Sequence, residues 1–512
     1  MQTKLHDLWH KNKKTLIFCI ICVAVWAILA HGYAFLNLQP SHDSLDGMHT
    51  VYPNHDDLHK IELGRIFYPA YCAVFRNMFY LPYLTGIYTV TWIALAAFLV
   101  VCALEITSVP GRIITCGIMT VNIAVTALTA TYGHDVDANM FSMLMACAAF
   151  FVWRKGKLSS LLAIATVAVS LGIYQSYICV TVALVIIALV KDLLDGKSAA
   201  SVFVSGVRAV ALIVLGGLLY IVCMRCSLKL TETALADGRS NSLMQLSALS
   251  VDILPFLSGK AYSNWLNYFT KSKTFLIASP VIRTVHQLMF LAGILALIAI
   301  LFSKETKPLQ KALLALLLGL FPLGANAIYI LSLGNVHDLM QYSFVFTYLL
   351  LFILLEYAVR RFSKTLFIRQ AYCALVFLVL WGGVQTANVA YHKKSLIYQA
   401  TYAKMTEIAH EMHMEGFDPY VPVLIEGSLP LQKMPGFEQV SRITGMDGNN
   451  SISSDSKSFL SYFQYILGEP ITFCTDRERI LVQNDPLYDE MPPYPTYGYV
   501  RMIQDVMVVR LD

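Results

Sequence analysis

Long hydrophobic runs separated by short polar segments dominate the sequence. An apolar run of about 20 residues is long enough to cross the hydrocarbon core of a bilayer as a helix. Eleven candidate runs lie at residues 15–37, 81–104, 110–131, 138–153, 158–174, 176–192, 204–226, 283–303, 310–331, 342–360 and 367–388. The runs at 158–174 and 176–192 meet at a polar break, which predicts two short helices or one long span with a re-entrant piece. The pattern therefore predicts a polytopic α-helical membrane protein with about 11 transmembrane helices.

The pattern changes after the last run, from about residue 391. A polar helical spacing at 396–413 precedes a short apolar strand at 421–425, a turn-rich piece at 445–456 and an alternating stretch at 499–511 that predicts a strand. About 120 residues are enough for a small α/β domain. We therefore divide the chain into a transmembrane domain, residues 1–390 with a loop over 38–80, and a C-terminal α/β domain, residues 391–512.

Composition supports a membrane protein. Hydrophobic residues make up 57% of the 512 residues and charged residues only 14%, whereas a soluble domain has about 25% charged residues. The mean hydropathy is +0.58. The lipid bilayer is therefore a predicted partner. The net charge of +5 forms no basic patch interleaved with aromatic residues, so no nucleic-acid partner is predicted.

Basic residues predict the orientation. Four lysines precede the first apolar run, which lacks a small-x-small cleavage site, so we expect an uncleaved first helix with a cytoplasmic N-terminus. The loops then placed inside (105–112, 153–157, 191–197, 303–311 and 359–369) all contain Lys or Arg. The short loops placed outside (132–138, 334–340 and the break at Tyr174) contain neither. By the positive-inside rule, the 38–80 loop and the C-terminal domain lie outside the cytoplasm.

The stretch from Ser41 to Arg65 is the densest polar segment between two spans. It contains five carboxylates and four histidines. Charges this dense beside a bilayer are costly, so they predict a site for acid–base or electrostatic chemistry. Arg65, which follows Gly64, can pair bidentately with a phosphate, and Lys60 lies close to it in sequence. The alternative for Arg65 is an interfacial side chain that reaches toward water.

His-Asp pairs recur in three of the predicted outside loops, at His42-Asp43, His55-Asp56, His134-Asp135 and His337-Asp338. An imidazole beside a carboxylate can bind a divalent metal, hold a phosphate-bound cation or divide the roles of base and orienting group. The alternative is that these loops are simply solvated.

Two further groups of residues suggest a site. Asp135-Val136-Asp137 has the DxD form that binds a metal and a diphosphate in nucleotide-sugar transferases. Nucleotide sugars are normally absent outside the cytoplasm, so we favour these two carboxylates as a second acidic wall of an outer vestibule.

Tyr174 and Gln175 interrupt an apolar run, which is typical of a cavity lining or of interhelical hydrogen bonds. The sequence has no phosphate-binding GxxxxGK[ST] loop, no GxSxG and no HExxH.

The order and spacing of several short motifs resemble the O-antigen glucosyltransferase type II family. The motifs are SHDSL at 41–45 followed by LGR at 63–65, LGIYQS at 171–176, and the ending GYV at 498–500 with VVRL at 508–511. Many members have paired acids where this chain has His42-Asp43, so Asp43 is the better match. The resemblance implies a multi-spanning enzyme of the membrane-embedded GT-C class in the bacterial cytoplasmic membrane.

The resemblance also implies a reaction. Such an enzyme moves a sugar, typically glucose, from undecaprenyl-phosphate-sugar to a surface polysaccharide such as O-antigen, with inversion at the anomeric carbon. Asp43 is then the expected base, and Lys60 and Arg65 the expected ligands of the leaving phosphate. The predicted substrate contacts are His42, Asp46, Asp56, Asp57, Asp135, Asp137, Tyr174, Gln175, His337 and Asp338. Five of them are candidates for binding sugar hydroxyls or a divalent cation, which is the only cofactor suggested: Asp46, Asp56, Asp57, Asp135 and Asp137.

Two other functions stay open at this point. A transporter or lipid flippase typically places charges near the bilayer midplane and shows repeat symmetry. This chain instead concentrates its acids in predicted outer loops and shows no internal repeat. A polysaccharide polymerase would also act outside the cytoplasm, but on diphosphate-linked oligosaccharides.

Overall fold

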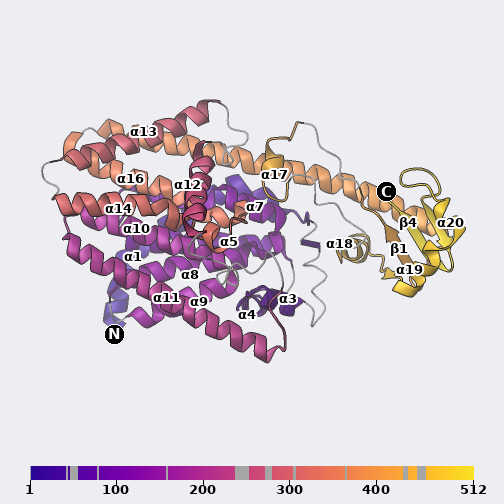
Figure 1. Ribbon diagram of the computed structural model, residues 1–512. Helices are drawn as coiled ribbons and strands as arrows, with labels where there is room; N and C mark the ends of the chain where they lie inside the picture. The colour runs from indigo at the N-terminus through magenta and orange to yellow at the C-terminus, as the bar shows by residue number, and fades with distance from the viewer. Residues whose placement is uncertain are drawn as a thin grey trace.

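The computed structural model describes residues 2–41, 44–45, 56–77, 80–156, 159–236, 253–270, 280–303, 307–363, 366–429, 436–446 and 457–511. Within these residues, ten helical segments are long and apolar enough to cross a membrane, and one further apolar helix is shorter. The C-terminal region contains a small mixed sheet. The predicted polytopic helical protein with a small C-terminal α/β region is therefore confirmed (Figure 1).

The helices form a bundle that one long helix leaves (Figure 1). Two short helices, α3 (Asp56–Glu62) and α4 (Tyr68–Phe75), lie between the first two long ones. The other helices of the bundle are α1 (Gln2–Leu36), α5 (Pro82–Ala103), α6 (Val109–Thr120), α7 (Ile123–Thr131), α8 (Val136–Arg154), α9 (Ser160–Ile173), α10 (Ile178–Leu194), α11 (Ala199–Leu230), α12 (Leu254–Thr270), α13 (Pro280–Phe302), α14 (Pro308–Ala325), α15 (Ala327–Leu331), α16 (Phe346–Ala358) and α17 (Leu366–Met414).

The polar break in the middle of the chain separates two helices. At Tyr174 the backbone leaves the helical region, with φ −155° and ψ 115°. One turn of 3₁₀ helix, η4 (Gln175–Tyr177), then leads into α10. The first of the two alternatives for this pair, two helices meeting at a break, is therefore confirmed. A second interruption, η2 (Gly133–Asp135), connects α7 to α8.

The long helix α17 connects the bundle to the C-terminal region. Its 49 residues extend about 74 Å at 1.5 Å per residue, more than twice the ~30 Å of a hydrocarbon core. Val379 packs in the core of the bundle, whereas Met405 and Ile408 pack in the core of the C-terminal region. The helix therefore contributes to both hydrophobic cores and passes through residue 390 without a break.

The C-terminal region is built on a four-stranded sheet. Its strands are ordered β2-β1-β4-β3, with β1 (Pro422–Glu426) parallel to both β2 (Thr472–Phe473) and β4 (Val506–Arg510), and β3 (Val500–Ile503) antiparallel to β4. The helices of this region are α18 (Lys457–Ser461), α19 (Asp476–Gln483) and α20 (Pro486–Asp489).

One predicted strand is confirmed and another is divided in two. The strand predicted at 421–425 corresponds to β1. The single strand predicted at 499–511 is a hairpin, because Gln504 (φ 50°) and Asp505 (φ 59°) form a tight turn between β3 and β4. Positive φ at both turn residues suits the twist of the strands. Neither residue is a glycine, so the sequence carried no strong signal for a turn.

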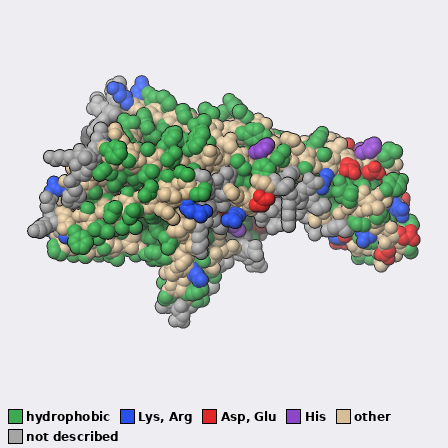
Figure 2. All heavy atoms as spheres, turned by 90° about the horizontal axis from the view of Figure 1, so that it is seen from above, with side chains coloured by type: hydrophobic (Ala, Val, Ile, Leu, Met, Phe, Trp, Pro, Cys, Tyr) green, Lys and Arg blue, Asp and Glu red, His purple; other side chains and the backbone are tan. Residues whose placement is uncertain are grey.

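The surface of the bundle suits a lipid environment. On the face seen in Figure 2, hydrophobic side chains cover much of the bundle, and acidic side chains gather mainly on the C-terminal region. Large apolar residues such as Ile28 on α1, Val210 on α11 and Val281 on α13 are more than half exposed. In water such a surface would be unfavourable, so a bilayer is the environment that accounts for it.

Candidate functional site

A buried carboxylate between α7 and α8 is the centre of the candidate site. Asp135 is only 1% exposed. Its Oδ2 accepts hydrogen bonds from Lys60 Nζ at 2.8 Å and Arg65 Nη1 at 3.1 Å, and its Oδ1 accepts one from the Tyr68 hydroxyl. We refer to Lys60, Arg65, Tyr68 and Asp135 as the Asp135 cluster. Because a buried carboxylate is stable only when it is paired and hydrogen-bonded, these groups hold one another in place.

A second ion pair lies directly beside this cluster. Arg76 Nε donates to Asp137 Oδ2 at 2.9 Å, and the Tyr71 hydroxyl donates to the same oxygen at 3.0 Å. Both charged side chains are almost fully buried. The Arg76 guanidinium also donates to the Tyr68 hydroxyl at 3.2 Å and to the His134 carbonyl. Arg76 therefore links the second pair to the Asp135 cluster.

A glycine turn positions Lys60 and Arg65. Helix α3 is followed by a turn at Gly64 (φ 75°), where Arg65 N donates to Lys60 O and Gly64 N donates to Ile61 O, both at 2.8 Å. This pair of hydrogen bonds is the usual glycine-dependent C-terminus of a helix. Tyr220 Oη on α11 donates to Gly64 O at 2.9 Å, and Gln175 Nε2 donates to Leu63 O at 3.2 Å. The turn is therefore fixed against both α11 and η4.

Arg65 is the most accessible cation of the site. Its side chain is 21% exposed, compared with 9% for Lys60 and 1% for Arg76. The guanidinium carbon lies 4.9 Å from the centre of the Tyr174 ring, a cation–π distance. Arg65 carries five N–H donors, and one of them binds Asp135.

The charges of the site do not cancel among the described residues. Lys60, Arg65 and Arg76 contribute three positive charges, and Asp135 and Asp137 contribute two negative charges. Burial, followed by the neighbouring Asp135 carboxylate, raises the pKa of the Tyr68 phenol well above its ordinary value. Tyr68 is therefore a neutral donor. Among these five side chains the cations outnumber the carboxylates, and cations of this kind favour an anionic ligand.

The start of the first predicted outer loop lies next to this site. Ser41 Oγ and Ser44 Oγ both donate to the Thr131 carbonyl, the second at 3.3 Å. Ser44 Oγ also lies 3.5 Å from His134 Nδ1, and His134 precedes Asp135. The chain on both sides of Asp43 therefore reaches the edge of the Asp135 cluster.

Comparison with known protein families shows which family the chain belongs to. The model of the glucosyl transferase GtrII family matches residues 32–355, more than half of the 512 residues. The chain belongs to the GtrII family. The match covers every residue of the Asp135 cluster, as well as Arg76 and Asp137. No curated protein and no solved structure matches the chain significantly. The resemblance seen in the short motifs is therefore confirmed, and the protein is a member of a family of membrane glucosyltransferases.

Several predicted site residues of this GtrII-family protein lie together. Lys60, Arg65 and Asp135 form one cluster, Tyr174 lies beneath Arg65, and Gln175 holds the backbone at Leu63. His42, Asp43 and Asp46 lie outside the described residues. Asp56 and Asp57 begin α3, and their side chains also lie outside the described part of the chain.

Asp338 has a different set of contacts. Its Oδ2 accepts hydrogen bonds from Thr444 N at 2.9 Å and from Thr444 Oγ1 at 3.0 Å. The backbone carbonyl of His337 accepts from Met340 N at 2.9 Å. Thr444 lies 106 residues further along the chain than Asp338, in the C-terminal region. Asp338 therefore connects the bundle to the C-terminal region.

The structure gives no support to a DxD-type metal site. Asp135 and Asp137 pair with different basic side chains, Asp135 with Lys60 and Arg65, and Asp137 with Arg76. In the described ranges, no group of three or more His, Cys, Asp or Glu side chains is placed to hold a metal ion. The two carboxylates are thus best described as the anchors of basic residues.

Three polar residues of the site were missed in the sequence. Tyr68, Tyr71 and Arg76 lie in a mainly apolar stretch at 66–76 that resembles an interfacial helix. The available signal was an arginine within an apolar segment beside a membrane, a position that is expensive and often functional. Its partner, Asp137, is 61 residues away in the chain, so the pairing had no local signature.

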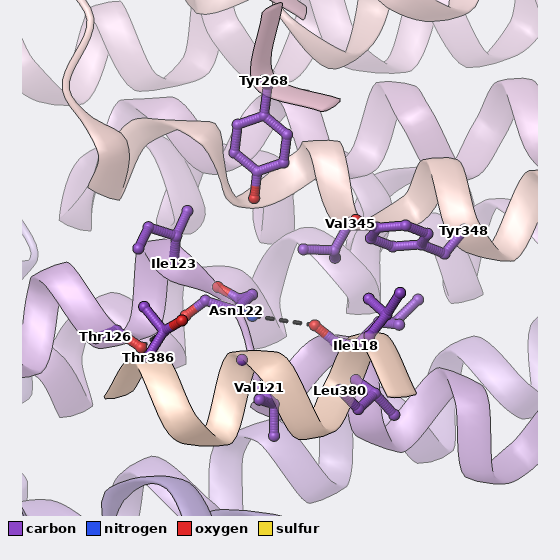
Figure 3. A pocket seen from close by; sticks show the side chains of 12 residues that line it. Ile118, Val121, Asn122, Ile123, Thr126, Tyr268, Val345, Tyr348, Leu380 and Thr386 are labelled. Carbon is purple, nitrogen blue, oxygen red and sulfur yellow. Dashed lines mark hydrogen bonds between the residues drawn. The ribbon is translucent and has the colours of Figure 1, made fainter. Parts of the chain in front are cut away.

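A separate pocket lies deeper in the bundle, where α6 gives way to α7 (Figure 3). Its lining is mainly apolar and includes Ile123, Tyr268 and Leu380. Asn122 Nδ2 donates to Ile118 O at 3.0 Å, and Asn122 Oδ1 accepts from Val125 N at 3.0 Å. These hydrogen bonds satisfy the side-chain amide of Asn122 at the break between α6 and α7. The pocket shares no residue with the Asp135 cluster.

Proposed function

We propose that this protein transfers glucose from undecaprenyl-phosphate-glucose to a surface polysaccharide such as O-antigen. Family membership supports glucosyl transfer. The bundle of apolar helices suits a lipid-linked donor, and the sequence has no nucleotide-phosphate loop. In this proposal residues 1–390 are the catalytic transmembrane domain, and residues 391–512 are an extracytoplasmic domain.

The observation that carries the proposal is the accessible arginine above a buried, net positive cluster. Arg65 is held by Asp135 on one side and by the Tyr174 ring on another, yet its side chain remains 21% exposed. A guanidinium fixed in this way can bind a phosphate oxygen without a large entropic cost. Arg65 would therefore hold the phosphate that leaves the sugar, with Lys60 behind it.

Asp43 is the proposed catalytic base. The next residue in the chain, Ser44, is bound at Thr131 and lies 3.5 Å from His134, and these contacts support the choice of Asp43. A carboxylate there would accept the proton of the acceptor hydroxyl while that oxygen attacks the anomeric carbon. Attack opposite the phosphate gives inversion, and it requires the base and the phosphate-binding arginine to face each other across the sugar.

Contacts at the other end of the bundle support an outward-facing site. There, Asp192 at the end of α10 pairs with Arg154 at 2.7 Å and with Lys197 at 3.0 Å. These basic residues belong to loops that the positive-inside rule assigns to the cytoplasm. The Asp135 cluster lies at the opposite ends of α8 and α10. On this basis we infer a cytoplasmic N-terminus and an extracytoplasmic active site in a bacterial cytoplasmic membrane.

The test is a transfer assay with purified protein in lipid nanodiscs. Undecaprenyl-phosphate-glucose and a polysaccharide acceptor are supplied, and released undecaprenyl phosphate is measured. We expect Asp43→Asn to abolish transfer and Glu62→Gln to preserve it, because Glu62 is a half-buried acid in the same loop without a contact to the cluster among the described residues. Near-normal transfer by Asp43→Asn would exclude Asp43 as the base.

The phosphate ligand and the donor class are tested in the same assay. Arg65→Gln is expected to raise KM for the donor about tenfold or more, since a charge-assisted hydrogen bond contributes about 1.5–3 kcal/mol. Turnover of a diphosphate-linked oligosaccharide in place of undecaprenyl-phosphate-glucose would indicate a polymerase. Movement of the lipid-linked sugar across the bilayer without release of undecaprenyl phosphate would indicate a transporter.

A further inference from the structure

The first predicted outer loop packs in the core of the C-terminal region, and the C-terminal region packs in the core of the helical bundle. Leu45 is 2% exposed, and it packs in the core of the C-terminal region together with Met405 and Phe459. In the opposite direction, Val440, Ile443 and Met446 of the C-terminal region pack in the core of the helical bundle. Each part thus contributes apolar side chains to the core of the other. The exchange occurs beside the residues that flank Asp43.

Thr131, at the end of α7, lies where the two segments meet. Its carbonyl accepts the hydroxyls of Ser41 and Ser44 from the first loop. Its own Oγ1 donates to Thr444 O at 2.9 Å. A Cβ on the neighbouring Gly445 (φ 77°) would overlap the Thr131 side chain, so the contact requires glycine. One buried threonine therefore binds both the loop and the C-terminal segment.

Further polar contacts fix the C-terminal segment on the bundle. Thr444 Oγ1 donates to Asp338 Oδ2 at 3.0 Å and lies 3.2 Å from Asp338 N, which donates to it. Lys393 on α17 donates to Ser441 Oγ at 2.6 Å and to the Met446 carbonyl. Lys393 is only 3% exposed. Buried charge-assisted hydrogen bonds of this kind are rigid, so residues 436–446 form a fixed support.

We propose that the C-terminal region positions the described residues that flank the catalytic base in the chain. Leu45 N donates to Ser41 O at 2.8 Å, so the two flanks of Asp43 are joined to each other. Ser41 and Ser44 are held by Thr131, and Leu45 is held in the C-terminal core. Leu45, Thr131 and Thr444 are therefore positioning residues for Asp43, an assignment that rests on the proposed function of Asp43. Rigid support matters because catalytic groups must be held within about 0.5 Å of their productive geometry.

The first test separates positioning from binding. Leu45→Ala is expected to lower kcat about 100-fold, the effect of a 1 Å misplacement, and to leave KM for the lipid donor within about twofold, since it does not alter Lys60 or Arg65. Leu45→Met should restore most of kcat because it nearly conserves volume. The matched control is Leu424→Ala, which creates a cavity on the opposite face of the same sheet, beside Val508.

Equal losses of kcat in Leu45→Ala and Leu424→Ala would overturn the proposal, because general destabilisation would then explain both. A rise in KM with unchanged kcat would also overturn it. Thr444→Val provides a second variant that removes only the hydroxyl contact to Asp338. It should lower kcat in the same direction as Leu45→Ala if the support acts through residues 436–446.

The second test requires no catalytic assay. Hydrogen–deuterium exchange of the amides at 41–45 is measured in the full-length protein in nanodiscs. We expect Leu45→Ala and Thr444→Val to speed exchange there about tenfold or more, and Leu424→Ala to leave it unchanged. Unchanged exchange in both variants refutes the positioning role. Faster exchange in a protein that shows no transfer would retain the mechanical link and refute only the proposed function.

Discussion

Replacing Gly64 by alanine is expected to damage the site through the backbone that carries Arg65. Gly64 adopts φ 75°, a conformation that costs an L-residue about 1 kcal/mol relative to glycine. A Cβ at this position would lie 2.6 Å from Tyr220 Oη and 3.0 Å from Gln175 Nε2. Both neighbours also hold the turn by hydrogen bonds, so they cannot move away without releasing it.

The expected loss of stability in Gly64→Ala combines the conformational cost and the steric cost, and a matched glycine separates the two. Overlap in a packed site adds about 1–3 kcal/mol, so Gly64→Ala should destabilise the turn by about 2–4 kcal/mol. Gly416 forms the turn after α17 with the same pair of backbone bonds and φ 87°, and a Cβ there would have no neighbour within 4 Å. Gly416→Ala therefore carries the conformational cost of about 1 kcal/mol alone.

The assay compares both variants with the unchanged protein. Initial rates of glucosyl transfer are measured in membranes and normalised to the amount of folded protein. A shift of Arg65 by about 1 Å should lower kcat/KM for the lipid donor about 100-fold in Gly64→Ala, whereas Gly416→Ala should keep its rate within about threefold. If both variants lose activity equally, or if neither does, the turn does not position Arg65 and the reasoning is wrong.

Three further outcomes are expected. Asp135→Asn should destabilise the protein by about 3–5 kcal/mol, seen as a lower Tm in detergent, because Lys60 and Arg65 lose their buried counter-charge. Arg76→Lys should cost about 2 kcal/mol by the same measurement, since a lysine cannot reach Asp137, Tyr68 and the His134 carbonyl together. Burial raises the pKa of Cys72 to about 12, so the folded protein should resist maleimide at this thiol at pH 8, where about one thiol in 10,000 is ionised; the same thiol after unfolding in denaturant is the positive control.

Part of the candidate site was predictable because it depends on topology. The positive-inside rule and the lengths of the apolar runs were enough to place Lys60, Arg65 and Asp135 on the same predicted side of the membrane. The polar break at Tyr174-Gln175 stood out for the same reason, since polar groups at membrane depth need partners. The structure confirms that these residues lie close together.

The role of Asp338 shows where such reasoning ends. As an acid in a predicted outer loop it was grouped with the other carboxylates, but its oxygen accepts hydrogen bonds from Thr444, 106 residues later in the chain. Likewise, the core position of Leu45 depends on residues more than 300 positions away. Local sequence records that a side chain is polar or apolar, and it does not record which distant segment will pack against it.

Membrane spans, the break between α9 and α10 and the family could all be recognised from the chain alone, because each depends on the length of a run or on the order of short motifs. The pairing of Asp135 with Lys60 and Arg65, the separate pairing of Asp137 with Arg76 and the packing of Leu45 in the C-terminal core emerged with the folded chain. The physical reason is that a buried charge or apolar side chain takes whichever partner the packed helices bring within about 3–4 Å. That choice depends on the arrangement of all the helices at once.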